Sequence, residues 1–358
     1  ATNSNFLTNV FSPTYGTDGQ HANPLVYSLS VASAGGVNSG LVDTATGEII
    51  YLFLEAGVVI GRVGSGGSPD LAGIEAIRIS FAGGEAVTLS QSRAVKHPTG
   101  GASHDESIAL LNGALSVRAV ARDGDGDTAI RQVNIGSRLT FLDDGPVFVS
   151  STTATVDEAD LPLGSSPTPS ALTQSGTLTI NFGADKGTAS QVDVQFTAAT
   201  LTALENWDNT ATGGEANNEN LTFTISNAGH TITATDSVSG LPAFTVTLTV
   251  DKATGATSYQ FVLSRALAHN NLPELHIPFN NLLITDGDGD TVSGNFVVRV
   301  IDDAPNQHVP INVSVYEDLY IPSGNSATNT FNTNADATGS NTVVNGTYIG
   351  PNTWKTAH

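Results

Sequence analysis

Two short acidic segments hold the residues whose types and spacing could do chemistry. In each, three aspartates alternate with two glycines and a threonine follows. The aspartates are Asp123, Asp125 and Asp127 in the first segment, and Asp286, Asp288 and Asp290 in the second. In a straight strand their carboxylates would share one face and repel one another. Glycine tolerates positive φ, so the backbone can curl and gather the carboxylates around one centre. Such a ring of oxygens suits Ca²⁺, which takes about 6–8 of them, better than Mg²⁺.

Neither segment fits the EF-hand pattern. That loop has glycine at its sixth position and glutamate at its twelfth. Here Thr128 and Thr291 hold the sixth position, and Asn134 and Val297 hold the twelfth. One acidic turn can be an ordinary solvated loop. Two equivalent copies favour a calcium loop between strands, with further ligands from elsewhere in the chain.

A second set of acids flanks two prolines. The segment 141–146 (Phe-Leu-Asp-Asp-Gly-Pro) returns 159 residues later at 300–305 (Val-Ile-Asp-Asp-Ala-Pro), and 156–158 (Val-Asp-Glu) returns at 315–317 (Val-Tyr-Glu). A cation shared across each junction would fix the orientation of successive repeats; the alternative is a charged linker solvated by water. The candidate ligands are Asp143, Asp144, Glu158, Asp302, Asp303 and Glu317.

The repeats also predict the domain organisation. A period of about 160 residues is the size of a whole domain, too long for a solenoid unit. Proline fixes its own φ and restricts the preceding residue, so each junction should be short and stiff. We predict β-sandwich repeats over residues 1–146 and 147–305, and the start of a third, incomplete or split repeat over 306–358.

Within the repeats, apolar residues alternate with polar ones. Phe244, Val246, Leu248 and Val250 are separated by threonines, and similar alternation runs through residues 25–31, 77–81, 178–182 and 309–315. This period of two is typical of half-buried strands. Residues 227–229 and 253–255 read as hairpin turns, and residues 201–205 carry a slight helical signal. The expected fold is all-β: tandem antiparallel β-sandwiches, immunoglobulin-like or cadherin-like, joined by short acidic, proline-containing linkers.

Composition excludes several classes. The 358 residues carry a net charge of −21, which repels phosphate backbones and excludes nucleic acid as a partner. The chain has no cysteine, so it forms no disulfide, and bound metal would be the alternative staple. No apolar run reaches the length of a membrane span, and no signal peptide is evident.

No familiar catalytic motif occurs, so we expect no enzyme. The serine-hydrolase elbow, the His-Glu-x-x-His motif and the phosphate loop are all missing. His97 and His104 are seven residues apart, as are His269 and His276. A zinc pair is conceivable, but surface or edge-strand histidines are the expected reading. Trp207 is expected in a core or junction.

The acidic loop, the strand after it and the Asp-Asp-Ala/Gly-Pro junction together resemble the tandem repeats of type I secretion targets in giant RTX adhesins. The resemblance covers residues 1 to about 305; beyond that only the opening of the third repeat matches. It implies calcium-rigidified sandwiches on the extracellular bacterial surface, export through a type I system, and roles in cell adhesion and biofilm formation. It also implies that the six loop aspartates ligate calcium.

Two functions remain open at this point. In the first, calcium-stiffened repeats project or support a ligand-binding domain, and their partners are calcium ions and neighbouring repeats. In the second, the chain is itself a binding module for a host or microbial surface glycan or peptide. That function predicts an aromatic-lined patch near Trp354 or around residues 58–68.

Overall fold

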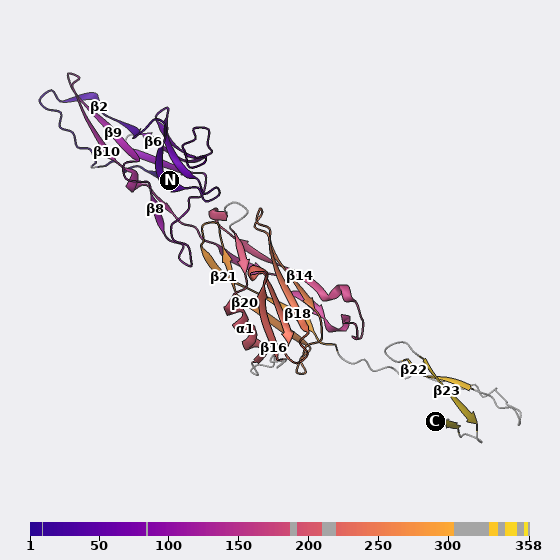
Figure 1. Ribbon diagram of the computed structural model, residues 1–358. Coiled ribbons are helices and arrows are strands. Elements are labelled where there is room, and N and C mark those ends of the chain that lie inside the picture. The colour runs from indigo at the N-terminus through magenta and orange to yellow at the C-terminus, as the bar shows by residue number, and fades with distance from the viewer. Residues whose placement is uncertain are drawn as a thin grey trace, which may run out of the picture. The chain divides into compact units, whose positions relative to one another are not determined.

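The computed structural model describes residues 1–8, 10–83, 85–186, 192–209 and 220–303, and the backbone of three strands nearer the C-terminus. Its contacts divide the chain into two units, Ala1–Pro305 and Asn306–His358. Among the described residues of the larger unit no sheet crosses Pro146, although an isolated bridge joins Gly101 to Asp290. We call residues 1–146 the first module and residues 147–305 the second module (Figure 1).

The first module holds a six-stranded sheet in the order β1-β7-β6-β5-β4-β3, a three-stranded sheet β10-β9-β2 and a two-stranded sheet β11-β8. Its strands are β1 Thr2–Asn3, β2 Gln20–Val31, β3 Val37–Val42, β4 Ile49–Glu55, β5 Val58–Val63, β6 Glu75–Gly83, β7 Ala86–Gln91, β8 Ser107–Ala109, β9 Leu115–Asp123, β10 Thr128–Asn134 and β11 Thr140–Leu142. A 3₁₀ helix, Gly136–Arg138, precedes β11. All these strands pair antiparallel.

The second module is a sandwich of a six-stranded sheet, β12-β14-β19-β18-β17-β16, and a four-stranded sheet, β13-β21-β20-β15. Its strands are β12 Val147–Ser151, β13 Ala154–Asp157, β14 Thr173–Asn181, β15 Asp193–Gln195, β16 Leu221–Ser226, β17 Thr231–Asp236, β18 Pro242–Val250, β19 Thr257–Leu263, β20 Glu274–Thr285 and β21 Thr291–Ile301. The helix α1 spans Ala198–Asn209, and 3₁₀ helices span Glu158–Asp160, Pro169–Leu172, Ala184–Lys186 and Asn227–Gly229. Of these strands only β13 and β21 pair parallel.

Each module has its own hydrophobic cluster. In the second module, aromatic rings from both sheets meet in the core. Phe244 of one sheet meets Phe279 of the other edge-on at 6.4 Å, and Tyr259 stacks on Phe296 at 3.9 Å. Such contacts bury much apolar area and fix the spacing of the layers.

The structure confirms the all-β, tandem antiparallel architecture, with the one parallel pair as an addition. Phe244, Val246 and Leu248 are buried while the threonines between them are more exposed, as the alternation predicted. Both predicted hairpin turns occur, and Trp207 is buried in the core. The helix is longer than the signal over residues 201–205 indicated. No helix in the described residues is long and apolar enough to span a membrane.

The smaller unit has described backbone in β22 Asn329–Ala335, β23 Asn341–Tyr348 and β24 Trp354–Thr356, which form one antiparallel sheet. The strand expected over residues 309–315 lies outside the described residues, as does Glu317. The third repeat therefore stays a prediction.

Candidate metal centre

The two acidic segments form hairpin loops of the same local geometry, one between β9 and β10 and the other between β20 and β21. Asp123 N–H donates to Asp127 O at 3.1 Å, and Asp286 N–H donates to Asp290 O at 3.0 Å. In each loop the second glycine adopts positive φ, 103° at Gly126 and 113° at Gly289. The first glycine of each loop does not, so one residue, not two, supplies the predicted curl.

The two loops differ sharply in burial. Asp286 and Asp290 are 1% and 0% exposed, and the side chain of Asp288 is 2% exposed. One carboxylate oxygen from each of these three lies within 4.8 Å of the others. In the first loop Asp125 and Asp127 are exposed. The second loop therefore gathers its predicted residues in a buried site, and the first loop presents its residues to solvent.

The cluster at the first loop differs from the predicted set. Oxygens of Asp123 and Asp125 gather within 4.8 Å of one another and of Asp18, and Asp127 is not in this group. Gly124 N–H donates to Gly19 O at 3.0 Å and holds Asp18 beside the loop. Partial burial and the neighbouring Asp125 raise the pKa of Asp123. Sequence reasoning missed Asp18 because it is a lone acid far away along the chain.

Electrostatics at the second loop are unfavourable for carboxylates without a cation. Burial, and then Asp288, raises the pKa of Asp286 to about 8. Burial, and then Asp143, raises the pKa of Asp290 to about 7. Several buried oxygens at the loop accept no hydrogen bond from the described residues: Asp286 Oδ2, Asp288 Oδ1, both carboxylate oxygens of Asp290, and Asp143 Oδ2. Buried polar atoms are normally paired, and buried like charges repel, so this set fits a hard cation that prefers oxygen.

The second loop lies against the first module, which contributes to its surroundings. Gly101 N–H donates to Gly289 O at 3.0 Å, and Thr291 N–H donates to Gly101 O at 2.6 Å. The side chain of Asp143 is 0% exposed and lies near Asp290. The acidic cluster therefore forms where the two modules meet.

Asp185 also lies at this boundary, and sequence reasoning missed it. The hydroxyl of Thr44 in the first module donates to Asp185 Oδ1 at 2.7 Å, and Gly287 N–H donates to Asp185 O at 2.7 Å. Burial raises the pKa of Asp185 to about 6, against the lowering effect of the Thr44 hydrogen bond. Asp185 stands in no repeated motif, so nothing in the sequence marked it.

Of the junction acids, Asp144 and Asp303 bond to backbone amides instead of joining a cluster. Asp144 Oδ2 accepts from Ala184 N–H at 3.0 Å across the module boundary. Asp303 Oδ2 accepts from Ser165 N–H at 2.9 Å. These contacts position loops, so the ligand assignment of both residues stays a prediction.

Glu158 and Asp302 do come together in the second module, beyond the end of β21 that lies away from the acidic loop. They form a group with His269 whose ligand atoms lie within 4.8 Å of one another. Glu158 Oε1 accepts from Leu267 N–H at 2.7 Å and lies 3.1 Å from His269 Nε2. Burial lowers the pKa of His269, but the hydrogen bond to Glu158 and the negative charges of Glu158 and Asp302 together outweigh it, so the net shift is upward.

The expectation of ordinary surface or edge-strand histidines is wrong for His97 and His269. They are 3% and 5% exposed and face carboxylates. His276 is exposed and His104 half-buried. The signal was present, because residues 93–97 and 265–269 match weakly and Asp143 and Asp302 are repeat equivalents. The repeat match could mark the two histidines, but no carboxylate stands near either of them in sequence at a ligand spacing, so the sequence did not identify their partners.

Residues 1–136 match a family described as a domain of unknown function (DUF5801). No curated protein matches the chain. Two solved structures are similar at low level, a protocadherin gammaB7 EC3–6 cis-dimer and the extracellular cadherin domains 3–6 of protocadherin gamma B2. Each is 13% identical with a TM-score of 0.25 and matches 90% of this chain. The chain spans 60% of the length of either structure. At this level they support no inference about function.

Proposed function

We propose that the chain is a calcium-stiffened repeat region of a large bacterial surface adhesin. In this role it projects or supports a ligand-binding domain outside the cell, in adhesion and biofilm formation, and it has no catalytic activity. The observation that carries the proposal is the buried cluster of Asp286, Asp288 and Asp290 at the module boundary. Four of its carboxylate oxygens accept no hydrogen bond from the described residues: Asp286 Oδ2, Asp288 Oδ1 and both oxygens of Asp290.

In this proposal each module is an independent sandwich, and the two modules meet at this cluster. Without a cation, the buried carboxylates of Asp286, Asp290 and Asp143 repel one another and weaken the boundary. Calcium would supply the missing positive charge and oxygen coordination. Because Asp143 belongs to the first module and the loop to the second, one ion would tie the two together. This coupling is how calcium would stiffen the chain.

Calorimetry of the full chain with millimolar Ca²⁺ and with EDTA tests the proposal. We expect chelation to lower the melting temperature of the second module by more than about 10 °C, since a ligand bound only to the native state stabilises it by mass action. Asp288→Ala should remove most of the calcium effect. Asp125→Ala, at the equivalent position of the exposed loop, is the matched control and should remove less. An identical melt with and without calcium would contradict the proposal.

The alternative is a glycan- or peptide-binding module, and one feature favours it. A hollow of about 280 Å³ opens in the first module, lined by Phe11 to Thr14 and by strands β2, β9 and β10. It lies away from residues 58–68, and the side chain of Trp354 is outside the described residues. A glycan array that gives hits lost on Arg131→Ala would favour this function, because Arg131 lines the hollow.

A further inference from the structure

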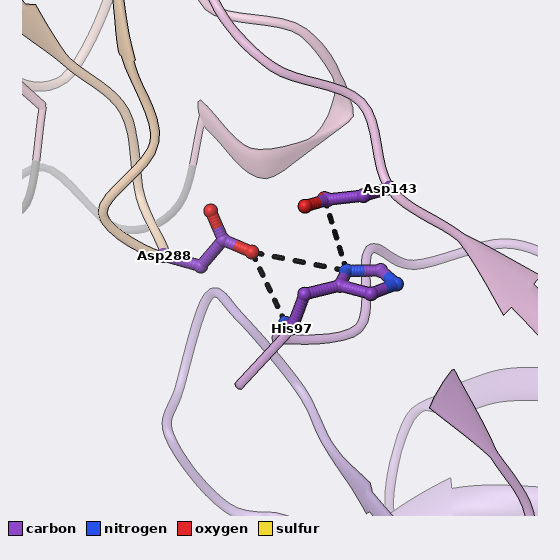
Figure 2. Close-up of side chains that lie close together, drawn as sticks. All are labelled: His97, Asp143 and Asp288. Carbon is purple, nitrogen blue, oxygen red and sulfur yellow. Dashed lines mark hydrogen bonds and ion pairs between the residues drawn. The ribbon is translucent and has the colours of Figure 1, made fainter. Parts of the chain in front are cut away.

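His97 lies at the module boundary and forms a buried group with two carboxylates. Its ring Nδ1 lies 3.0 Å from Asp143 Oδ1 and 3.8 Å from Asp288 Oδ2 (Figure 2). The side chains of His97, Asp143 and Asp288 are 2%, 0% and 2% exposed. Asp143 comes from the same module as His97, whereas Asp288 comes from the second module. Solvent therefore screens this group very little.

The other ring nitrogen fixes the tautomer of His97. Nε2 lies 3.3 Å from the carbonyl oxygen of Phe141, which can only accept, so Nε2 carries the proton. Nδ1 makes no hydrogen bond among the described residues. In the neutral ring it therefore turns a lone pair toward two carboxylate oxygens. A histidine that donates its far N–H to a backbone carbonyl and turns the other nitrogen to anionic oxygens has the arrangement found in metal-ligating histidines.

The separations fit a small tetrahedral ion. With metal–ligand bonds of about 2.0–2.1 Å, neighbouring ligand atoms of tetrahedral zinc lie about 3.3 Å apart. The two distances from Nδ1, 3.0 and 3.8 Å, lie on either side of that value. Imidazole nitrogen with carboxylate oxygen suits Zn²⁺, whereas Ca²⁺ takes oxygen ligands.

We propose that His97 Nδ1, Asp143 and Asp288 form a zinc site that joins the two modules. The site does not depend on calcium binding, but it shares two carboxylates with the proposed calcium cluster. Asp143 and Asp288 each turn one oxygen toward His97, and the second oxygen of each, Asp143 Oδ2 and Asp288 Oδ1, accepts no hydrogen bond. Both carboxylates can therefore bridge a zinc ion and a calcium ion.

The second module provides a natural comparison at His269, the repeat counterpart of His97. Its Nε2 lies 3.1 Å from Glu158 Oε1 in a hydrogen bond, and the bond raises the pKa of the ring. Its Nδ1 makes no hydrogen bond among the described residues. The ring nitrogen of His269 that faces Glu158 is thus hydrogen-bonded, whereas in His97 the nitrogen that faces the acids is the one without a hydrogen bond.

Calorimetric titration of ZnCl₂ into the full chain tests the site, once in millimolar Ca²⁺ and once in calcium-free buffer. We expect one zinc ion bound in calcium-free buffer, at least tenfold weaker binding in His97→Gln, and unchanged binding in His269→Gln. Glutamine keeps a donor for the Phe141 carbonyl but removes the Nδ1 ligand. Zinc binding in calcium-free buffer tests this proposal separately from the calcium proposal. The calcium proposal is tested only by the change in melting temperature between Ca²⁺ and EDTA.

X-ray absorption at the zinc edge of the wild-type chain gives a second readout that needs no variant. Scattering from one imidazole in a shell of oxygen would support the site even if His97→Gln folds poorly. An oxygen-only shell, no zinc binding, or equal binding by wild type and His97→Gln would overturn it. The last two results would leave His97 as a buried neighbour of Asp143 and Asp288 and not as a zinc ligand.

Discussion

Arg93 and Asp43 form a bidentate ion pair in the first module. Arg93 Nε donates to Asp43 Oδ1 at 2.6 Å and Nη2 donates to Oδ2 at 2.8 Å, with the Asp43 side chain 0% exposed. Arg265 pairs with Asp236 in the second module, and each of these aspartates accepts from a Ser or Thr hydroxyl three residues later. The two modules therefore share one kind of ion pair that fixes a strand end beside the segment that carries His97 in the first module and His269 in the second.

We expect Arg93→Ala to lower the free energy of unfolding by about 3 kcal/mol, because it leaves Asp43 buried without its counter-charge. Arg265→Ala is the matched control. The side chain of Asp236 is 11% exposed, against 0% for Asp43, so solvent screens this pair more and the loss should be smaller. Urea unfolding of both variants measures the difference. Equal losses would mean that burial does not set the strength of these pairs.

The fold was largely predictable from sequence because it rests on local rules. Alternation in residues 244–250 and the glycine-containing turns depend on near neighbours, and the structure confirms them. The parallel pairing of β13 with β21 was not predictable, because it joins segments about 140 residues apart with no pattern that sets their direction.

The candidate site was predictable only in part, for the same reason. The repeat identified Asp286, Asp288 and Asp290 because the motif is contiguous. It could not show that one copy is buried and the other exposed, because that depends on which surface each loop meets. Asp18, Asp185 and His97 join the clusters through long-range packing, and no local spacing marks them.

Asp290→Asn should change stability in opposite directions with and without calcium. The wild-type carboxylate is buried among other acids, so in EDTA the amide relieves repulsion and should raise the melting temperature by a few degrees. With calcium the same change removes a proposed ligand and should reduce the stabilisation by the ion. Asp127→Asn, at the equivalent position of the exposed loop, should change the melting temperature little in either buffer. Calorimetry of both variants in both buffers measures all four changes in melting temperature. A lower melting temperature for Asp290→Asn than for the wild type in EDTA would refute the repulsion.

The metal-free protein should lose stability as pH rises from about 4 to 8. In the fold the pKa of Asp286 is raised to about 8 and that of Asp290 to about 7. The unfolded chain ionises near the usual value of about 3.9, so between these pH values the folded state holds more protons and rising pH favours unfolding. Asp185, with a pKa raised to about 6, acts in the same direction.

Urea unfolding in EDTA at intervals from pH 4.5 to 8 measures this slope. His230 and His269, whose pKa values are also raised, favour unfolding as pH rises, but only above about 6.5, where the unfolded ring loses its proton. The window from pH 4.5 to 6 therefore separates the aspartates from the histidines. Glu55 and Glu75, whose pKa values are lowered by arginine partners, act in the opposite direction only near the low end, where the unfolded glutamates titrate. Millimolar Ca²⁺ should flatten the slope, because it binds the ionised form. A stability that rises with pH across this window in EDTA would contradict the raised pKa values.

Gly100→Ala should uncouple the two modules. A Cβ at Gly100 would lie 2.6 Å from Gly289 O and 2.8 Å from Gly289 C, and backbone cannot yield as a flexible side chain can. The clash falls beside the hydrogen bonds that join Gly101 to Gly289 and to Thr291. We expect the clash to separate the two modules and to lower the free energy of unfolding by about 1–3 kcal/mol. The melt should split into two transitions, and calcium should stabilise the second module less.

Gly35→Ala is the control for the substitution itself, because Gly35 also has no positive φ and its Cβ would meet nothing closer than Ser33 Oγ at 3.8 Å. It should melt like the wild type. Limited proteolysis adds a second measurement, since an opened boundary exposes residues 97–101 and should speed cleavage there in Gly100→Ala alone. If both variants melt and cleave alike, close backbone approach at Gly100 and Gly289 does not hold the modules together, and the burial of the acidic cluster must come from the contacts of Thr44 and Asp144 instead.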